Sequence, residues 1–196
     1  MAISKIQSES MNLADTFAFT GTVTGTGTGL ELLATIDATP SASTFEYTMD
    51  YDSYNNFLII VDRISGSSTS TSENLDVKFK MDGTLDDGAS TPYFTTNTIE
   101  FNTVRNINAT DNMEFITTNN PSKMHSGIIH CVNFSNNDRR PQMHFSLGGA
   151  TGGSDFGHYI GSCGMDVTSK QVTAIRYAFT AGNVTIVKQK IYGITE

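Results

Sequence analysis

Hydrophobic and polar residues alternate along most of this chain, and the alternation is clearest in its last stretch, residues 172–194. One arm of that stretch covers residues 172–179 and the second covers residues 184–191. The short segment between the arms carries Gly182 and Asn183, which tolerate the positive φ that tight hairpin turns require. The pattern therefore predicts that the chain ends in an antiparallel β-hairpin.

Similar short segments recur at short intervals along the chain, as they do in β-sandwiches and barrels. The predicted strands are residues 31–36, 44–49, 56–64, 75–81, 97–105, 113–118, 127–134, 142–147, 156–161, 171–179 and 184–191. Clusters of Gly, Asn, Asp and Ser separate them, and no segment between them has a helical period. The sequence predicts an all-β protein, an antiparallel two-sheet sandwich of jelly-roll type.

The two-residue period of a strand assigns side chains to faces. In the strand at 75–81, one face carries Leu75, Val77, Phe79 and Met81. In the strand at 127–134, one face carries Ile128, His130, Val132 and Phe134. Residues 57–61 are apolar at every position, which predicts a central strand buried on both faces.

The first 29 residues differ from the remainder. Their apolar side chains are sparse, and residues 24–29 alternate Thr with Gly, too flexible a composition for the interior of a strand. We expect residues 1–29 to form an N-terminal arm with a hinge and residues 30–196 to form the sandwich domain. The arm is expected to dock on a neighbouring chain, because it has too little apolar surface to fold alone.

Charge limits the partners of this chain. The formal net charge is −8, whereas binding nucleic acid or an anionic membrane requires clustered Lys and Arg. The nearest such feature is Arg139-Arg140, flanked by Asp138 and Pro141, which is typical of a solvated turn. We expect no nucleic-acid partner and no membrane partner, since even the apolar run 57–61 is too short to cross a bilayer.

Two cysteines, Cys131 and Cys163, are too few for a disulfide framework. The first residues lack the apolar core of a secretory signal peptide. We therefore expect synthesis in a reducing cytoplasm, with both cysteines as free thiols.

The metal-ligating residue types are scattered. His125, His130, His144 and His158 show no short zinc-type spacing with the cysteines. His130 and Cys131 are adjacent on a predicted strand and should point to opposite faces. The sequence predicts no metal and no cofactor.

Catalytic motifs are equally weak. Asp50 and Asp52 would share a face, as paired carboxylates do in glycosidases, but an exposed loop explains them as well. A calcium loop starting at Asp82 fails because Tyr93 stands where the bidentate Glu is needed. No nucleophile elbow of the Gly-x-Ser-x-Gly type occurs. We expect no enzymatic activity.

Several blocks of the sequence resemble one known family. The C-terminal block has the form Ile-Arg-x-x-Phe-x-x-Gly-Asn from Ile175 and closes on Tyr-Gly-Ile at 192–194. Further similar blocks are residues 5–15, 19–25, 52–61, 74–83 and 127–135, in the same order along the chain. Together they resemble bacteriophage virion surface proteins that end in a β-sandwich, of the capsid-decoration or tail-fibre type.

The resemblance implies a non-enzymatic structural protein of the virion that is made in the host cytoplasm and assembles as an oligomer, a homotrimer. A decoration or cement protein would grip the capsid through its arm and outer loops. A tail-fibre or receptor-binding protein would instead present its loops to a host surface glycan. The short arm has no heptads, which favours compact decoration. A cellular carbohydrate-binding module is a third possibility, weakened by the absence of Trp.

Binding, in any of these functions, is expected on the loops at the ends of the sandwich. The longest polar loops are residues 65–73, 84–93 and 148–157. Their neighbours Tyr93, Phe156 and Tyr159 are the candidate binding residues, because aromatic rings can stack on a sugar or pack against a capsid subunit. The alternative is that these rings are buried anchors beneath solvated loops.

Overall fold

The computed structural model of this chain describes residues 29–49, 52–69, 73–85, 93–100, 103–105, 113–119, 124–135, 138–150, 156–165 and 170–195. These residues form thirteen β-strands. The strands are β1 Leu30–Ala38, β2 Thr44–Thr48, β3 Asn56–Gly66, β4 Glu73–Met81, β5 Thr84–Leu85, β6 Tyr93–Glu100, β7 Thr103–Arg105, β8 Met113–Asn119, β9 His125–Val132, β10 Gln142–Ala150, β11 Phe156–Met165, β12 Val172–Phe179 and β13 Val184–Ile194.

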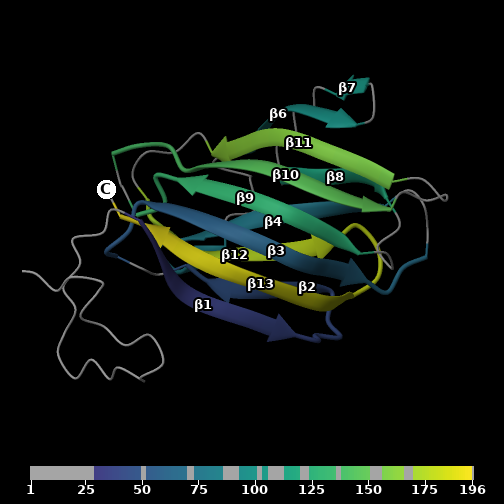
Figure 1. Cartoon of the computed structure of the whole chain (residues 1–196), viewed down its shortest axis with the longest axis horizontal. Coiled ribbons are helices and arrows are strands. Elements are labelled where there is room, and N and C mark those ends of the chain that lie inside the picture. Colours follow the sequence, from purple (N-terminus) through teal and green to yellow (C-terminus); the bar gives the residue numbers. More distant parts are fainter. Residues whose placement is uncertain are drawn as a thin grey trace, which may run out of the picture.

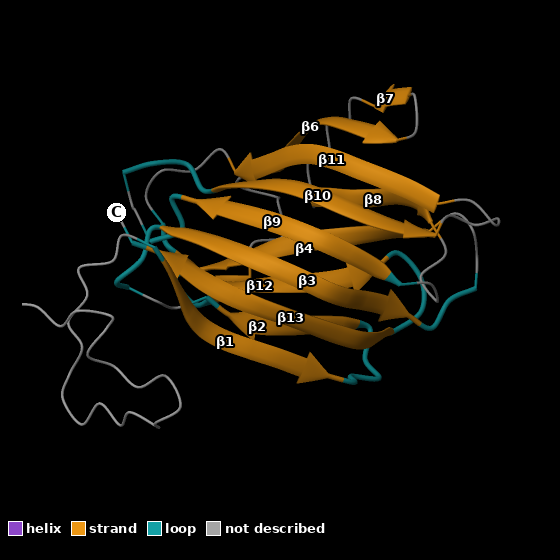
Figure 2. Ribbon diagram, in the orientation of Figure 1, coloured by secondary structure: helices purple, strands orange, loops and turns teal. Residues whose placement is uncertain are grey.

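The strands form two antiparallel sheets that lie one over the other (Figure 1). The larger sheet has eight strands in the order β1-β13-β3-β9-β10-β11-β6-β7. The smaller has five, in the order β2-β12-β4-β5 with β8 also paired to β4. Figure 2 shows strands and loops but no helix in the described residues. The predicted all-β, two-sheet antiparallel sandwich is confirmed.

The strand boundaries differ from the predictions in a few places. The predicted strand at 97–105 is two strands, β6 and β7, and the short β5 was not predicted. β5 exists because Asp82 and Gly83, at φ 47° and 80°, form a two-residue turn that folds β5 back onto β4. β11 and β13 extend further than predicted, to Met165 and Ile194.

The core lies between the two sheets. Phe57 of the larger sheet and Phe79 of the smaller sheet are fully buried. The ring of Phe134 lies between them, with its centroid 6.0 Å from that of Phe57 and 5.1 Å from that of Phe79. The predicted shared face of β4 is confirmed, since alternate residues from Leu75 to Met81 are buried.

A buried chain of polar groups also joins the sheets. The Tyr177 hydroxyl of the smaller sheet donates a hydrogen bond to Gln189 Oε1 of the larger sheet at 3.2 Å, and Tyr47 Oη lies 2.9 Å from Tyr177 Oη. Burial raises the pKa of both tyrosines, so their hydroxyls keep the protons that these bonds require. The two sheets are thus held in one alignment by directional contacts as well as by apolar burial.

The predicted C-terminal hairpin is wrong, because β12 and β13 do not pair. β12 lies between β2 and β4 in the smaller sheet, and β13 lies between β1 and β3 in the larger sheet. Alternation shows only that a strand has one buried face, and strands that cover the core from opposite sides alternate in the same way. The segment with Gly182 and Asn183 therefore connects the two sheets.

This connection is held by the β3–β4 connection, which also crosses between the sheets. Ser67 N donates to Asn183 O at 2.8 Å, and Thr180 N donates to Asn74 O at 3.1 Å. Gly182 has a φ of 81°, and Ser67 Oγ lies 2.9 Å from the place a Cβ would take. Glycine is needed here both for the positive φ and for the close approach of the neighbouring connection.

β3 corrects a second prediction. It is central, as expected, with β13 and β9 as neighbours. It is not buried on both faces, since Ile60 is 40% exposed while Ile59 and Val61 are buried. The reason is that only one face of the larger sheet is covered by the other sheet.

The shared face predicted for β9 is partly wrong. Ile128 and His130 point outward, while Ile129 and Cys131 lie in the core. Phe134 follows the end of β9 and is fully buried, so it does not lie on the Ile128 face. Asn133, at a φ of 62°, ends the strand before Phe134 turns inward.

Two of the blocks that carry the family resemblance meet in space. The ring of Tyr54 lies against Gly193, where a Cβ would come within 2.4 Å of Tyr54 Cδ1. The Tyr54 hydroxyl also donates a short hydrogen bond to Glu31 Oε2 on β1. These residues pack the sandwich together, so the resemblance rests on positions that determine the fold.

Residues 1–28 lie outside the described part of the chain, and so does the predicted arm with most of its hinge. Gly29 is described, and its N donates to Thr195 Oγ1 at 2.8 Å beside the end of β13. No helix among the described residues is long and apolar enough to cross a membrane.

Candidate interaction surface

The three aromatic residues predicted to bind a partner lie in strands. Tyr159 is in β11 and is fully buried, so the prediction that it offers a ring to a partner is wrong. The pleat of β11 turns it inward, and it acts as the buried anchor that was the alternative. Tyr93 begins β6 and Phe156 begins β11, but their side chains are outside the described residues, so both stay predictions.

The two cysteines are free and buried. Both pair in register with Met143 on the intervening strand β10, which places Cys131 and Cys163 about 10 Å apart. That separation is too large for a disulfide. Burial raises the pKa of both thiols. His130 is exposed while Cys131 is buried, so the predicted opposite orientation is confirmed.

The described acidic residues of the predicted turns have structural contacts. Asp82 Oδ1 accepts a hydrogen bond from Gln171 N at 3.1 Å, and Asp52 Oδ1 accepts one from Gln171 Nε2 at 2.9 Å. Asp50 and the aspartates at 86–87 lie outside the described residues. Among the residues that the structure describes, no three His, Cys, Asp or Glu side chains are grouped as a metal site would require.

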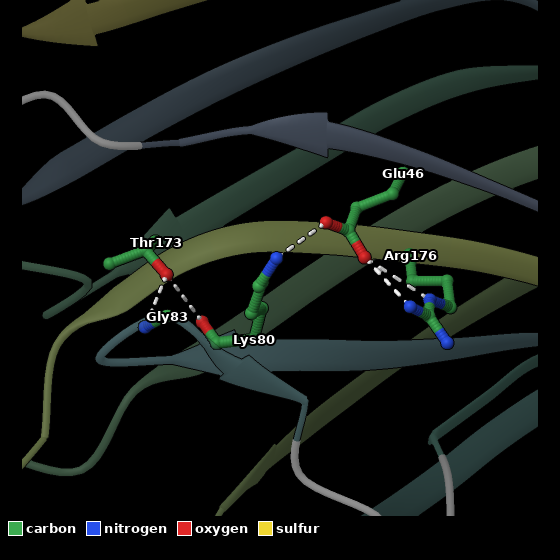
Figure 3. Close-up of polar contacts among 5 residues, drawn as sticks. All are labelled: Glu46, Lys80, Gly83, Thr173 and Arg176. Carbon is green, nitrogen blue, oxygen red and sulfur yellow. Dashed lines mark hydrogen bonds and ion pairs between the residues drawn. The ribbon is translucent and has the colours of Figure 1, made fainter.

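The outer face of the smaller sheet carries fixed charges that pair with one another (Figure 3). Glu46 of β2 accepts hydrogen bonds from Arg176 Nη2 of β12 at 2.9 Å and from Lys80 Nζ of β4 at 3.1 Å. The hydrogen bond from Arg176, followed by that from Lys80, lowers the pKa of Glu46. Thr173 ties the same strands, accepting from Gly83 N and donating to Lys80 O. We call this surface the charged face; its charged residues are Glu46, Asp76, Lys78, Lys80 and Arg176.

The outer face of the larger sheet is different. Ile60 of β3, Ile128 of β9 and Ile160 of β11 are 40%, 48% and 43% exposed. They lie in one row across the strands, since Ile60 pairs with Ile128, Ile128 with Ser146, and Ser146 with Ile160. Large exposed apolar side chains are unremarkable singly but informative when they are contiguous.

The next row along the strands carries two histidines. His130 and His144 face each other across β9 and β10, with ring centroids 6.4 Å apart. Leu58 pairs with His130 on the other side, and His144 pairs with Ser162. Burial, and to a lesser degree the charge of His144, lowers the pKa of His130, which favours a neutral His130 ring at pH 7.

The row on the opposite side of the isoleucines is made of smaller groups. Ser126 pairs with Gly148, and Gly148 pairs with His158. The His158 ring is held by a hydrogen bond between its Nε2 and Ser146 Oγ at 2.8 Å. We call the three rows together the uncharged face: Leu58, Ile60, Ser126, Ile128, His130, His144, Ser146, Gly148, His158, Ile160 and Ser162.

The sequence itself explains why this face has no fixed charge. The three consecutive strands β9, β10 and β11 contain no Asp, Glu, Lys or Arg at any position. That run of uncharged strands is the signal that could have identified the surface from the sequence. The predicted binding residues lie beside loops, whereas this surface lies on the strands.

A groove borders the uncharged face at Ile60. It has a volume of about 490 Å³ and lies over β1, β13 and β3. Its lining residues are Thr35, Ile36, Asp37, Ile60, Asp62, Lys188, Gln189, Lys190 and Tyr192. Lys188 Nζ and Asp37 Oδ2 form an ion pair of 3.0 Å at its rim.

No protein-family model, curated protein or solved structure matches this chain. Two observations therefore bear on its function: the arrangement of the two outer faces, and the resemblance of the sequence blocks to virion proteins.

Proposed function

We propose that this chain is a non-enzymatic structural protein of a bacteriophage virion, an oligomeric decoration or cement protein on the capsid surface. The expected oligomer is a trimer, and the expected partners are further copies of the chain and other virion subunits. The sequence blocks that resemble virion surface proteins motivate the class of protein. The arrangement of the outer faces supports its mode of action.

The observation that carries the proposal is the uncharged face. Monomeric soluble proteins rarely expose contiguous apolar surface, and a larger exposed apolar area marks a contact site. Ile60 and Ile128 are neighbours in one exposed row and Ile160 follows beyond Ser146, on a chain whose net charge is −8. A protein whose task is to be held against a neighbour needs a surface of this kind.

The described charges favour a structural role over catalysis. Glu46 forms ion pairs with Arg176 and Lys80 on an open surface. Catalytic groups work in sites that exclude water, where unpaired charges and perturbed pKa values are useful. The charged face is arranged for solubility.

The test is the presence of the chain in particles. Virions of the phage that encodes the chain would be purified by density gradient, analysed by mass spectrometry and labelled with gold-tagged antibody. We expect many copies per particle, with the label on the capsid. Absence of the chain from purified particles would contradict the proposal.

The arm gives a second experiment on the same proposal. If residues 1–29 grip the capsid, removal of residues 1–15 should leave the sandwich folded but prevent incorporation. Normal incorporation of the truncated chain would contradict capsid attachment through the arm.

A second function is favoured by the groove, namely a tail-fibre or receptor-binding protein that contacts a host surface glycan. Tyr192 supplies an aromatic ring, and Asp62 and Lys190 supply hydrogen-bonding groups beside it. Glycan-array binding that is lost in Tyr192→Ala and kept in Thr48→Ala, on the exposed β2 of the smaller sheet, would support it. Label on the tail instead of the capsid would support it independently.

A further inference from the structure

We infer that the uncharged face is the docking surface for a second copy of this chain. This inference deepens the proposed function and rests on it in one respect only, that the chain works as an oligomer. The twofold contact described below joins copies in pairs, so it predicts a dimer in place of the trimer that the resemblance implies. Three properties of the uncharged face favour a second copy of the chain as its partner: charge, size and shape.

Charge is the first property. Each copy carries a formal net charge of −8, so a contact between two copies is least opposed where neither has a fixed charge. β9, β10 and β11 provide such an area, with no Asp, Glu, Lys or Arg in any of the three strands. On the charged face, by contrast, Glu46 is already paired with Arg176 and Lys80 of the same chain.

Size is the second property. The four strands of the face, β3, β9, β10 and β11, span about 19 Å at the usual strand spacing, and eight residues in register span about 26 Å. The projected area is therefore about 500 Å², against roughly 800 Å² per partner in a standard-sized interface. The face is large enough to supply most of a stable contact.

Shape is the third property. Two copies that meet face to face are related by a twofold axis lying in the plane of contact. If that axis runs along the isoleucine row, Ile60, Ile128 and Ile160 each lie against their own counterparts. The large rings of His130 and His144 then lie opposite the small residues Ser126 and Gly148 of the other copy. Large groups meet small ones, as interlocking sheet faces require.

The first experiment measures the mass of the purified full-length chain by size-exclusion chromatography with light scattering, from about 1 to about 100 µM. We expect an oligomer for the wild type and loss of association in Ile128→Glu, which places one carboxylate beside its own counterpart. Ile160→Glu tests a second strand in the same way. Thr48→Glu, on the exposed β2, is the matched control and should associate like the wild type. Circular dichroism checks that each variant is folded.

The second experiment identifies the occupant. With a bis-maleimide crosslinker that spans about 10 Å, Ile128→Cys should form a covalent dimer, because the axis places residue 128 opposite its own copy at the usual spacing of packed sheets. Thr48→Cys should not. The native Cys131 and Cys163 are buried and therefore do not compete.

Three results would overturn the inference. They are a monomeric wild type, an Ile128→Glu variant that is folded and still associates, and Ile128→Cys that crosslinks no faster than Thr48→Cys. Any of these means that the arm, a groove ligand or another protein covers the face. Association in solution without the chain in particles overturns only the virion proposal, and a monomer found in particles overturns only this inference.

Discussion

The two outer faces of this sandwich are built from the same kind of element, yet they present opposite surfaces to water. On the smaller sheet, Glu46 is paired with Arg176 and Lys80, and β4 carries Asp76, Lys78 and Lys80 at successive outward positions. On the larger sheet, three exposed isoleucines lie beside a pair of histidines, with no fixed charge on β9, β10 or β11.

The difference is typical of a face that stays in contact with solvent and a face that binds another molecule. A solvent-exposed sheet face is covered with charges that pair with one another and keep a chain soluble. A face with exposed apolar residues costs solubility and offers nothing to the fold itself, since the core is complete without it. The contrast supports the proposal that the larger sheet, rather than the smaller one, provides the docking surface.

We expect the largest change in the free energy of unfolding from a core isoleucine, and a much smaller one from an outer isoleucine that folding does not need. Ile129 is fully buried, whereas its neighbour Ile128 is 48% exposed on the other face of β9. Ile129→Ala should lower the free energy of unfolding by about 2–5 kcal/mol, because it leaves a cavity between the sheets. Ile128→Ala should cost less than about 1 kcal/mol when measured on dilute protein. Urea denaturation at low protein concentration measures both free energies of unfolding. Equal losses would mean that Ile128 contributes to the stability of the fold as much as Ile129 does.

A smaller effect is expected on the charged face. Arg176 and Lys80 lower the pKa of Glu46 from 4.5, so this group stabilises the fold above the unfolded-state pKa, and the stabilisation is lost as the pH falls through the lower folded-state value. Glu46→Gln should cost less than about 1 kcal/mol at pH 7, because the group is exposed and screened. The difference from wild type should vanish in acid and shrink in high salt. A cost that is independent of pH would show that packing, not charge, is responsible.

Acid should affect the two faces differently. The folded-state pKa of His130 is lowered from 6.5 by burial and by His144, so its contribution is complete above pH 6.5 and is lost as the pH falls through the lower value. The groups that face His130 are Leu58 from β3 and His144 from β10, and neither is a carboxylate that could offset a new positive charge. Self-association should therefore weaken as the pH falls below 6.5, through the lowered pKa of His130.

NMR titration separates the two causes. His144→Gln should move the pKa of His130 part of the way back to its ordinary value, because it removes the smaller cause and leaves burial. His158→Gln changes a histidine of the same face that pairs with Gly148 instead, and it should leave His130 unchanged. Equal shifts in both variants would contradict a specific pair.

We expect the least reactivity from the two cysteines on the inner, buried side of the larger sheet. Cys131 and Cys163 are buried, and burial raises the pKa of both thiols. Neither should react with an alkylating reagent in the folded protein, and both should react once it is unfolded without reductant. A mass two units low with no labelling would show a disulfide, which the spacing across Met143 forbids.

The sequence predicted most strands because their local signals are strong. Alternation and turn residues located eleven segments. What alternation cannot encode is which sheet a strand joins, so β12 and β13 were paired when they lie on opposite sides of the core. The same limit explains β3, where an unbroken apolar run suggested cover on both faces although Ile60 is exposed.

The candidate site was harder to predict than the fold. Tyr159 was expected near a loop, but β11 begins before it and turns its ring inward. The uncharged face depends on the register of four strands that are far apart in the sequence, which brings Ile60, Ile128 and Ile160 into one row. No local pattern around any one of the three isoleucines shows that alignment.

The most direct test of this account compares both faces in one experiment. Hydroxyl-radical footprinting of the full-length chain, analysed by mass spectrometry, would be performed at concentrations where the chain is associated and where it is dissociated. We expect association to protect Ile128, His130 and His144, while Thr48 and Lys80 on the smaller sheet keep their reactivity. Equal protection of both faces, or protection of the smaller sheet alone, would contradict the claim that the uncharged face is the assembly surface.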